Sequence, residues 1–377
     1  MPTRYNSTFQ NPTFSLMLKL DTLINRWIRP EIRAISAYHV PDSSGLIKLD
    51  AMENPYTWPE AMVNEWQVLL SKAPVNRYPD PAASRLVNSL RKEMAIPDEM
   101  GVMLGNGSDE LIQIIAQAVA RPDESIMSPT PSFVMYQMIA TFVGMSFIGV
   151  PLNEAFALDI ESMLMAIKTQ QPAVIFLAYP NNPTGNLFND GDIEKILEVA
   201  EGVVVIDEAY HAFAGQSWMG RLGEYPNLLV MRTVSKLGLA GLRLGFLVGP
   251  NGWIEQFDKV RLPYNINTLT QMTAEFALAN IEIFNEQTRS IREQRESLMQ
   301  QLNQIEGITP YPSAANFILF RVEKGLSNAI FNGIKERGVL IKNMGQSDGP
   351  LSDCLRVTVS SEAENHCFVE ALKATLK

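Results

Sequence analysis

The chain has 377 residues, which is long enough for two domains that share a large core. Hydrophobic residues make up 46% of it and charged residues 19%, as is typical of an ordinary soluble globular protein. The formal net charge of −10 leaves no basic surplus to neutralise phosphates, so a nucleic-acid-binding protein is not expected.

Cysteine and histidine usage limits the chemistry further. Two cysteines, Cys354 and Cys367, give no disulfide framework, so we expect a cytoplasmic protein. The three histidines have no metal-ligand spacing, and we therefore expect no metal: His39, His211 and His366.

Residues 1–16 are rich in Asn, Thr and Pro and predict a flexible N-terminal extension without a signal peptide. The segment 18–35 predicts one or two short helices that break at Pro30. Residues 47–50 predict a short strand. We expect residues 17–60 as a whole to join a small domain formed mainly by the C-terminal part of the chain.

Between residues 101 and 250, short apolar strands alternate with helices, which predicts a mainly parallel sheet covered by helices on both faces. We assign residues 61–269 to this large domain. The stretch 129–152 has no charge over a length that could span a bilayer. Its prolines, glycines and polar residues instead favour a loop, a helix over 133–142 and a strand over 145–150, so no membrane association is expected.

The turn at Gly105–Ser108 follows a predicted strand and opens a predicted helix over 109–120. Its glycines permit tight backbone geometry, and the N–H groups at a helix start suit a phosphate. A glycine turn before a helix is weak evidence by itself.

Two apolar runs, 174–178 and 203–207, are typical of strands buried on both faces of a parallel sheet. Asp207 then lies at a carboxyl end, where open α/β sheets bind ligands, and its carboxylate can keep a pyridine nitrogen protonated. Tyr210 and Asn182 can both hydrogen-bond a phenolate oxygen on such a ring.

Lys236 follows Ser235 in a Gly/Ala-rich turn, with Arg243 seven positions on. A lysine amine can form a Schiff base with an aldehyde, and the hydroxyls and guanidinium can hold a phosphate. Pyridoxal phosphate carries both groups. Taken alone, the stretch is explained equally well by a surface lysine beside a glycine turn.

After residue 250 the pattern changes to a long helical run over 270–305, followed by strands near 315–320 and 355–359 and helices near 326–337 and 361–376. We assign 270–377 to a smaller α+β domain. Arg356 lies in an apolar strand, where an unpaired guanidinium would be costly. Its partner is either a substrate anion or a structural ion pair.

Three motifs resemble the fold-type I pyridoxal-phosphate-dependent aminotransferases: Asn182-Pro183-Thr184-Gly185, Asp207-Glu208-Ala209-Tyr210 and Ser235-Lys236 with Arg243. Four more narrow the resemblance to the histidinol-phosphate aminotransferases, over about residues 17–377: Glu53–Tyr56, Arg77–Pro81, Gly105–Glu110 and Cys354–Thr358.

This resemblance implies an α/β fold with a mainly parallel, seven-stranded sheet and pyridoxal phosphate as cofactor. It implies that the catalytic residues are Lys236, Asp207 and Tyr210. The implied cofactor contacts include these three together with Gly107, Ser108, Asp109, Phe133, Asn182, Thr233, Ser235 and Arg243. It also implies a homodimer in which Tyr78 reaches the partner's cofactor phosphate.

The substrate contacts that the resemblance implies are Asn54, Tyr56, Lys342 and Arg356. The implied reaction converts histidinol phosphate and 2-oxoglutarate to imidazole-acetol phosphate and glutamate, in histidine biosynthesis. On the residues alone, Tyr78 is just as well explained as a loop anchor. Core packing is the alternative for Phe133, and an ordinary loop is the alternative for residues 53–56. The Lys236–Arg243 spacing is one residue shorter than in some relatives, so the conformation of the turn between them stays open.

Three other functions remain open. An aromatic amino-acid aminotransferase of broad specificity and a threonine-phosphate decarboxylase would share nearly all of the cofactor residues. A non-catalytic regulator would need an added DNA-binding domain, which the short N-terminal extension and the acidic charge disfavour.

Overall fold

A computed structural model describes residues 12–37, 40–345 and 349–377, without the side chains of 12–16 and 18. The chain forms two compact units, residues 1–42 and 43–377. The first unit contains α1 (Pro12–Trp27) and α2 (Pro30–Ala34). The predicted break at Pro30 is found, because a proline is tolerated in the first turn of a helix.

Part of the N-terminal prediction differs from the structure. Helix α1 includes residues 12–16, where the composition predicts a flexible extension. The rest of that predicted extension, residues 1–11, lies outside the described residues, as does His39.

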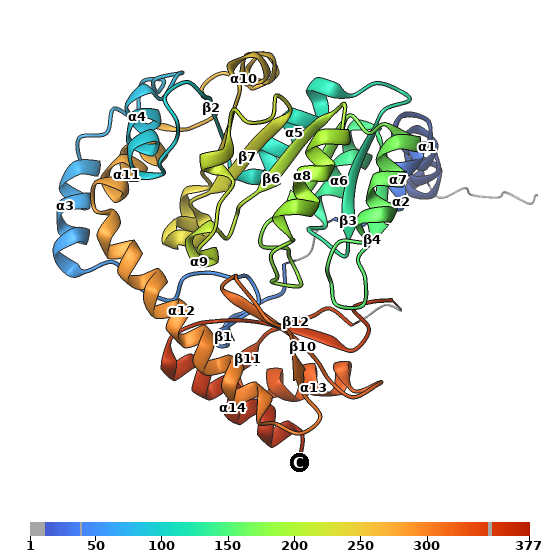
Figure 1. Ribbon diagram of the computed structural model, residues 1–377, viewed down its shortest axis with the longest axis vertical. Coiled ribbons are helices and arrows are strands. Elements are labelled where there is room, and N and C mark those ends of the chain that lie inside the picture. The colour runs from blue at the N-terminus through green and yellow to red at the C-terminus, as the bar shows by residue number, and fades with distance from the viewer. Residues whose placement is uncertain (1–11, 38–39, 346–348) are drawn as a thin grey trace, which may run out of the picture. The chain divides into compact units, whose positions relative to one another are not determined.

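The second unit is built on a seven-stranded sheet (Figure 1). Its strands, in spatial order, are β2 (Gly101–Gly105), β8 (Gly245–Gly249), β7 (Leu228–Thr233), β6 (Val203–Asp207), β5 (Val174–Ala178), β3 (Ser125–Thr130) and β4 (Ser146–Pro151). Strand β8 runs antiparallel to both of its neighbours, and the remaining pairs are parallel. The predicted α/β fold with a mainly parallel sheet is confirmed.

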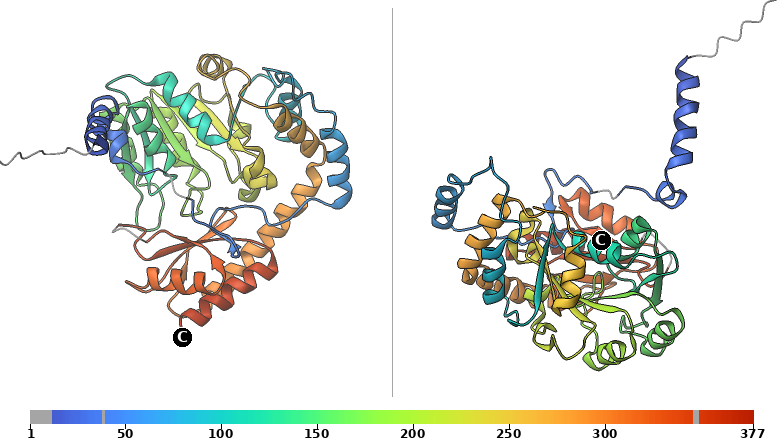
Figure 2. Two further views of the ribbon diagram at one scale, coloured as in Figure 1. Left: turned by 180° about the vertical axis from the view of Figure 1, so that it is seen from behind. Right: turned by 90° about the horizontal axis from the view of Figure 1, so that it is seen from above.

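Helices cover both faces of this sheet, as the front and back views show (Figures 1 and 2). They are α5 (Ser108–Val119), α6 (Met135–Val143) and α10 (Asn251–Asp258) on one face, and α7 (Ile160–Gln170) and α8 (Asp190–Val199) on the other. Along β5, Phe176 packs in the hydrophobic core on the side of α5, α6 and α10, and Leu177 packs in the core on the side of α7 and α8. This alternation follows from the two-residue period of a strand and explains why the strand is apolar throughout.

The remaining helices of this part are α3 (Glu60–Leu70), α4 (Ser84–Glu93), α9 (His211–Ala214), α11 (Thr268–Ala279) and α12 (Ile281–Asn303). The prediction of one continuous helical run over 270–305 is wrong. Asn280 has φ −113° and ψ 31°, outside the helical region, and its side chain donates to the Phe276 carbonyl. Helix α11 contacts α3 and α4, so the division of residues 43–377 at position 269/270 stays a prediction.

A second sheet is antiparallel, with the order β12 (Lys342–Asn343), β13 (Cys354–Thr358), β10 (Phe317–Arg321) and β9 (Thr309–Pro310). Helices α13 (Ser327–Glu336) and α14 (Glu362–Thr375) pack with it (Figure 1). Strand β1 (Ile47–Lys48) pairs in parallel with β11 (Val339–Leu340). Residues 47–48 thus pair with the C-terminal part of the second unit, whereas residues 17–42 of the segment expected to join the small domain belong to the first unit. The assignment of residues 17–60 to the small domain stays a prediction.

The uncharged stretch 129–152 contains the end of β3, helix α6 and strand β4, close to the predicted loop, helix and strand. Within the ranges that the structure describes, no helix combines the length and the apolar character needed to cross a membrane. No group of three or more His, Cys, Asp or Glu side chains among the same residues is arranged to hold a metal ion.

Candidate active site

One cavity opens at the carboxyl ends of β5, β6 and β7 and brings together most of the predicted site residues. Its lining includes ten of them: Ser108, Asp109, Phe133, Asn182, Asp207, Tyr210, Thr233, Ser235, Lys236 and Arg243. They come from six separate parts of the sequence. The cavity lies where the rule for open α/β sheets places a ligand site.

Asp207 is the last residue of β6 and is almost completely buried. Its Oδ2 accepts a hydrogen bond from the Tyr136 hydroxyl at 2.7 Å, and its Oδ1 accepts one from the Ala209 N–H at 3.1 Å. Burial raises the pKa of Asp207 to about 6, and the Tyr136 hydrogen bond opposes that rise. The carboxylate is therefore poised to ionise fully once a cationic partner is present.

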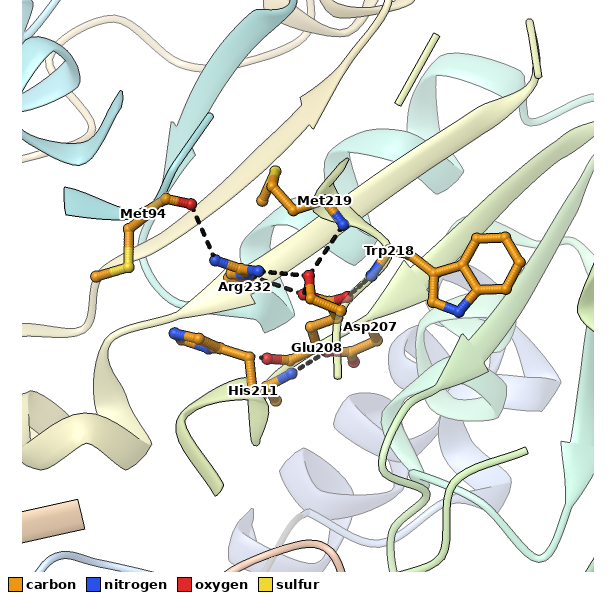
Figure 3. Close-up of polar contacts among 9 residues, drawn as sticks. Met94, Asp207, Glu208, His211, Trp218, Met219 and Arg232 are labelled. Atoms are coloured by element: carbon orange, nitrogen blue, oxygen red, sulfur yellow. Dashed lines mark hydrogen bonds and ion pairs between the residues drawn. The ribbon is translucent and has the colours of Figure 1, made fainter. Parts of the chain in front are cut away.

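The next residue, Glu208, belongs to a buried network beside the cavity (Figure 3). It pairs with Arg232 of β7, with 2.8 Å between Arg232 Nε and Glu208 Oε2. The Trp218 N–H and the Ser217 hydroxyl also donate to this carboxylate. Because Arg232 immediately precedes Thr233, the pair ties the end of the strand that carries Asp207 to the strand that leads to Lys236.

Asn182 joins two other side chains of the site. Its amide nitrogen donates to the Tyr210 hydroxyl at 3.1 Å, and its oxygen accepts from Arg356 Nη1 at 2.5 Å. Arg356 Nη2 also donates to the Asp50 carbonyl at 3.0 Å. The guanidinium lies over the Phe317 ring, 5.3 Å from its centroid. Contacts that include these groups thus hold Arg356 of β13 beside Asn182, which lines the cavity.

Lys236 lies in a short π-helical turn, Ser235–Leu239, at the end of β7. Its Nζ donates to the Ala51 carbonyl at 3.0 Å. Burial lowers the pKa of Lys236 to about 8, and the positive charge of Arg356 acts in the same direction. This lowering gives the amine a neutral fraction of about a tenth at pH 7, far larger than that of an ordinary lysine.

Asn54 lies behind this lysine turn. Its side-chain amide donates to the Leu237 carbonyl at 3.1 Å and to Gln287 Oε1 at 3.0 Å. The turn can approach so closely because Gly238, at φ +126°, has no Cβ; an added Cβ would lie 2.9 Å from Asn54 Nδ2. In this structure Asn54 supports the lysine turn and does not line the cavity.

The other end of the cavity is rich in hydrogen-bond donors. Ser108 opens α5, and the Thr233 and Ser235 hydroxyls lie 2.8 Å apart. Arg243 Nη1 lies 3.4 Å from Ser235 Oγ. Gly107 has φ +80°, and an added Cβ there would lie 2.7 Å from Arg243 Nη2. A helix N-terminus, hydroxyls and a guanidinium in this arrangement suit a phosphate.

Six predicted residues lie outside the cavity lining: Asn54, Gly107 and Arg356, described above, and Tyr56, Tyr78 and Lys342. Lys342 is the cross-strand neighbour of Arg356 in the β12–β13 pair, so both side chains emerge on the same face of the small sheet. Tyr56 packs against the core of that sheet. Tyr78 is 81% exposed and stacks on Tyr264, with ring centroids 4.5 Å apart.

Two further residues of the site, Tyr136 and Met52, were not predicted from the sequence. Tyr136 follows Phe133 by three residues and falls within the helix predicted over 133–142, so the helical period could have placed both on one side of that predicted helix. In the structure Phe133 lies just before α6 and Tyr136 in its first turn. Met52 lines the cavity at φ 54°, and its N–H donates to Thr358 Oγ1. No signal in the sequence marks Met52, because it depends on contacts between residues more than 300 positions apart.

Comparisons with known proteins agree with this geometry. Residues 44–372 match the family model described as aminotransferase class I and II. The chain is 54% identical over 354 residues to histidinol-phosphate aminotransferase 2 of Nitrosococcus oceani, covering 94% of this chain and 98% of the relative. It is 50% identical over 361 residues to histidinol-phosphate aminotransferase 2 of Cupriavidus pinatubonensis, with 94% and 98% covered.

Among solved structures, histidinol-phosphate aminotransferase of Sinorhizobium meliloti, in complex with pyridoxal-5'-phosphate, superimposes with a TM-score of 0.83. It is 22% identical, with 93% of this chain and 97% of that chain covered, and at this identity the likeness shows the fold. A parallel sheet with a lysine and an aspartate at its carboxyl edge, in a chain that matches the class model over most of its length, defines an aminotransferase of class I and II. Within that class, the chain belongs to the histidinol-phosphate aminotransferase family.

Proposed function

We propose that this protein binds pyridoxal phosphate in the cavity and uses it to transfer an amino group. The observation that carries the proposal is the arrangement of the cavity itself. It holds a lysine with a lowered pKa, a buried carboxylate and a donor-rich end within one lining. These groups fit an aldehyde, a pyridine nitrogen and a phosphate respectively. The missing Cβ of Gly107 leaves room beside Arg243 at the donor-rich end.

When bound, the cofactor supplies an aldehyde for imine formation and a ring that accepts electrons from the substrate carbon. Asp207 supplies the negative charge that holds a proton on the ring nitrogen. The Tyr210 hydroxyl and the Asn182 amide, which are hydrogen-bonded to each other, fix the polar groups around the ring oxygen. Phe133, on the cavity lining, would cover one ring face.

Lys236 then acts as the base and acid of the reaction. With the cofactor bound, its Nζ would take up the proton of the substrate α-carbon and later give a proton back, because a pKa of about 8 permits both roles near neutral pH. The Asn54 hydrogen bond to the Leu237 carbonyl keeps the lysine turn in place. Water is limited around Nζ because the side chain is largely buried and bonded to Ala51.

For the substrates, we propose histidinol phosphate as amino donor and 2-oxoglutarate as acceptor, giving imidazole-acetol phosphate and glutamate within histidine biosynthesis. The names of the relatives support this choice, and the residues are compatible with it. Each substrate must present an anion to the same pocket. Arg356 can bind a carboxylate or a phosphate with its planar fork, and Lys342 emerges beside it on the same face. Tyr56 remains a proposed substrate contact.

We also propose a homodimer with shared sites. Tyr78 is highly exposed, although its ring is held by stacking on Tyr264. Other exposed apolar side chains occur in the same parts of the sequence, on Val75 and Leu262. A second copy of the chain would cover such groups and could receive the Tyr78 hydroxyl at its phosphate end. The two free cysteines, Cys354 and Cys367, are consistent with a cytoplasmic location.

The test is a substrate comparison with purified protein. We expect a yellow protein in which borohydride reduction fixes the pyridoxyl group on Lys236, and we expect turnover to be lost in Lys236→Ala. By kcat/KM, histidinol phosphate should be preferred to phenylalanine and tyrosine by a large factor. Phosphothreonine should release no carbon dioxide.

Each alternative function has its own outcome in this comparison. A preference for aromatic amino acids would replace the proposal with a broad aromatic aminotransferase. Carbon dioxide release would indicate a decarboxylase. A pyridoxyl label on another lysine would overturn the assignment of the whole site.

A further inference from the structure

The phenol ring of Tyr136 is completely buried against the carboxyl end of the large sheet. It stacks on Phe176 of β5 with centroids 4.8 Å apart and an angle of 5° between the rings. Phe133 meets it edge-on, at 5.6 Å and 86°. This packing fixes the ring on two sides, and its hydroxyl donates to Asp207 Oδ2 at 2.7 Å. The hydroxyl therefore has one defined direction.

The surroundings of Asp207 disfavour the charged form of its carboxyl group. Burial favours the neutral acid, and the nearby carboxyl groups of Asp109 and Glu208 add to this effect. Two hydrogen bonds oppose it, one to each carboxylate oxygen, from Tyr136 and from the Ala209 N–H. Tyr136 stays a donor, because burial and the neighbouring Asp207 raise the pKa of its phenol well above the ordinary value. The Tyr136 bond is the shorter of the two.

We propose that Tyr136 is a positioning residue that acts through Asp207: its hydroxyl holds the carboxylate ionised and oriented toward the cavity, where the cofactor ring nitrogen would bind. This rests on the proposed function. Each carboxylate oxygen can accept more than one hydrogen bond, so both keep acceptor capacity for the ring. A hydrogen bond to a charged acceptor contributes more than one between neutral groups.

A neutral donor suits this position better than a cation. A lysine or arginine here would also keep Asp207 ionised, but its positive charge would compete with the ring nitrogen for the carboxylate. The phenol stabilises the carboxylate and leaves its full charge for the ring. Phe133, just before α6, and Tyr136, in its first turn, would then serve one ring, the first against its face and the second through Asp207.

The experiment compares the holoenzyme with Tyr136→Phe, which removes only the hydroxyl. The matched control is Tyr179→Phe, since Tyr179 is equally buried and its hydroxyl lies 2.9 Å from both Asp190 and Gln216, but outside the cavity lining. For Tyr136→Phe we expect a pyridoxal phosphate dissociation constant raised about tenfold and a kcat lowered at least tenfold, with KM little changed. Tyr179→Phe should change thermal stability without moving either constant.

A double-mutant cycle separates positioning from general packing. In an Asp207→Asn background the charge is gone, so adding Tyr136→Phe should cost much less than it does in the wild-type protein. Equal costs in the two backgrounds, or a Tyr136→Phe protein that matches the Tyr179→Phe control, would overturn the inference. Failure of the wild-type protein to bind pyridoxal phosphate would instead refute the proposed function, so the two failures are distinguishable.

Discussion

Arg356 Nη1 and Asn182 Oδ1 lie 2.5 Å apart, although the two residues are 174 positions apart in the sequence. The contact joins β13 of the small sheet to the loop that follows β5 in the large sheet. Asn182 passes the connection on, because its amide nitrogen donates to the Tyr210 hydroxyl. Arg356, the proposed group for the substrate anion, is therefore hydrogen-bonded through Asn182 to Tyr210. Substrate binding at Arg356 can affect the positions of Asn182 and Tyr210, the two groups proposed for the ring oxygen.

The first prediction follows from this contact. We expect Arg356→Lys to lower kcat/KM at least tenfold for both the amino donor and the amino acceptor, which corresponds to about 1.4 kcal/mol. A lysine keeps the charge but has a single ammonium in place of the planar fork, so it loses either Asn182 or part of the substrate anion. Half-reaction kinetics with each substrate measure the effect.

Arg321→Lys on the neighbouring strand β10 is the control for this substitution. Arg321 bonds to Tyr311 and to the carbonyls of Ser352 and Pro350, outside the cavity. Its change should affect unfolding and leave both half-reactions close to normal. A loss in only one half-reaction for Arg356→Lys would mean that the two substrates place their anions on different groups.

The second prediction concerns Gly107. Its backbone has φ +80° and ψ 174°, a region that is essentially restricted to glycine and costs other residues about 1–3 kcal/mol. An added Cβ would also press on Arg243 Nη2. We expect Gly107→Ala to raise the dissociation constant for pyridoxal phosphate at least tenfold, as measured by equilibrium titration of the apoprotein.

Gly325→Ala provides the comparison for this change. Gly325 also has positive φ, +83°, but an added Cβ there would meet nothing within 4 Å. It should lose stability without losing cofactor affinity. Equal losses of affinity in the two variants would mean that backbone strain, and not the space beside Arg243, accounts for the effect.

The third prediction is a pH dependence of the apoprotein. Burial raises the pKa of Asp207 to about 6 from its ordinary 3.8, so between these values the unfolded chain has released a proton that the folded chain still holds. The free energy of unfolding should therefore fall as pH rises from about 4 to 6. The size of the fall is about 3 kcal/mol from this one group.

Denaturant unfolding of the apoprotein at a series of pH values measures this slope, and Asp207→Asn isolates its source. The variant has no carboxyl group to titrate, so the difference between the two proteins should grow through this window and be constant above pH 7. Parallel curves for the two proteins would show that the pKa of Asp207 is unperturbed.

In the holoenzyme, Asp207→Asn should also lower kcat about a hundredfold, or about 2.7 kcal/mol.

Local sequence patterns were sufficient to predict the edge of the sheet at which the candidate site lies. Apolar runs without polar interruption predict strands buried on both faces, and parallel strands bring their carboxyl ends to one edge. Asp207, at the end of one such run, and Lys236, just past β7, could therefore be placed near one another without knowledge of the tertiary structure. The glycines near residue 107 likewise predicted a turn because of the backbone that they permit.

Contacts that depend on the packing of distant segments could not be predicted in this way. The Tyr136 hydroxyl donates to the Asp207 carboxylate, 71 positions away, and the Asn54 amide donates to the Leu237 carbonyl, 183 positions away. The break at Asn280 was also missed, since the run around it has a continuous helical composition. Asparagine favours helix caps over helix interiors, but a single asparagine does not mark a helix end by itself, and its backbone angles in the folded chain show that the helix ends there.

The last prediction tests whether the active site is shared between subunits. Under the proposed function, Lys236→Ala and Tyr78→Ala should each be inactive or severely impaired as homodimers, because the first would lack the base and the second would lack a phosphate contact in both sites. In a hybrid dimer, one site receives both changes and the other receives neither if Tyr78 serves the opposite subunit. Mixed proteins that exchange subunits should therefore recover activity.

The exposure of Tyr78 is the reason to expect this arrangement. Its side chain is 81% exposed, so its own subunit does not cover it, and stacking on Tyr264 holds the ring in place. Tyr264→Ala, mixed with Lys236→Ala in the same way, asks whether that stack matters: the ring of Tyr78 loses its support, and we expect partial impairment that hybrids relieve. Hybrid dimers verified by mass spectrometry without recovered activity would mean that Tyr78 acts within its own subunit or has no role at the phosphate.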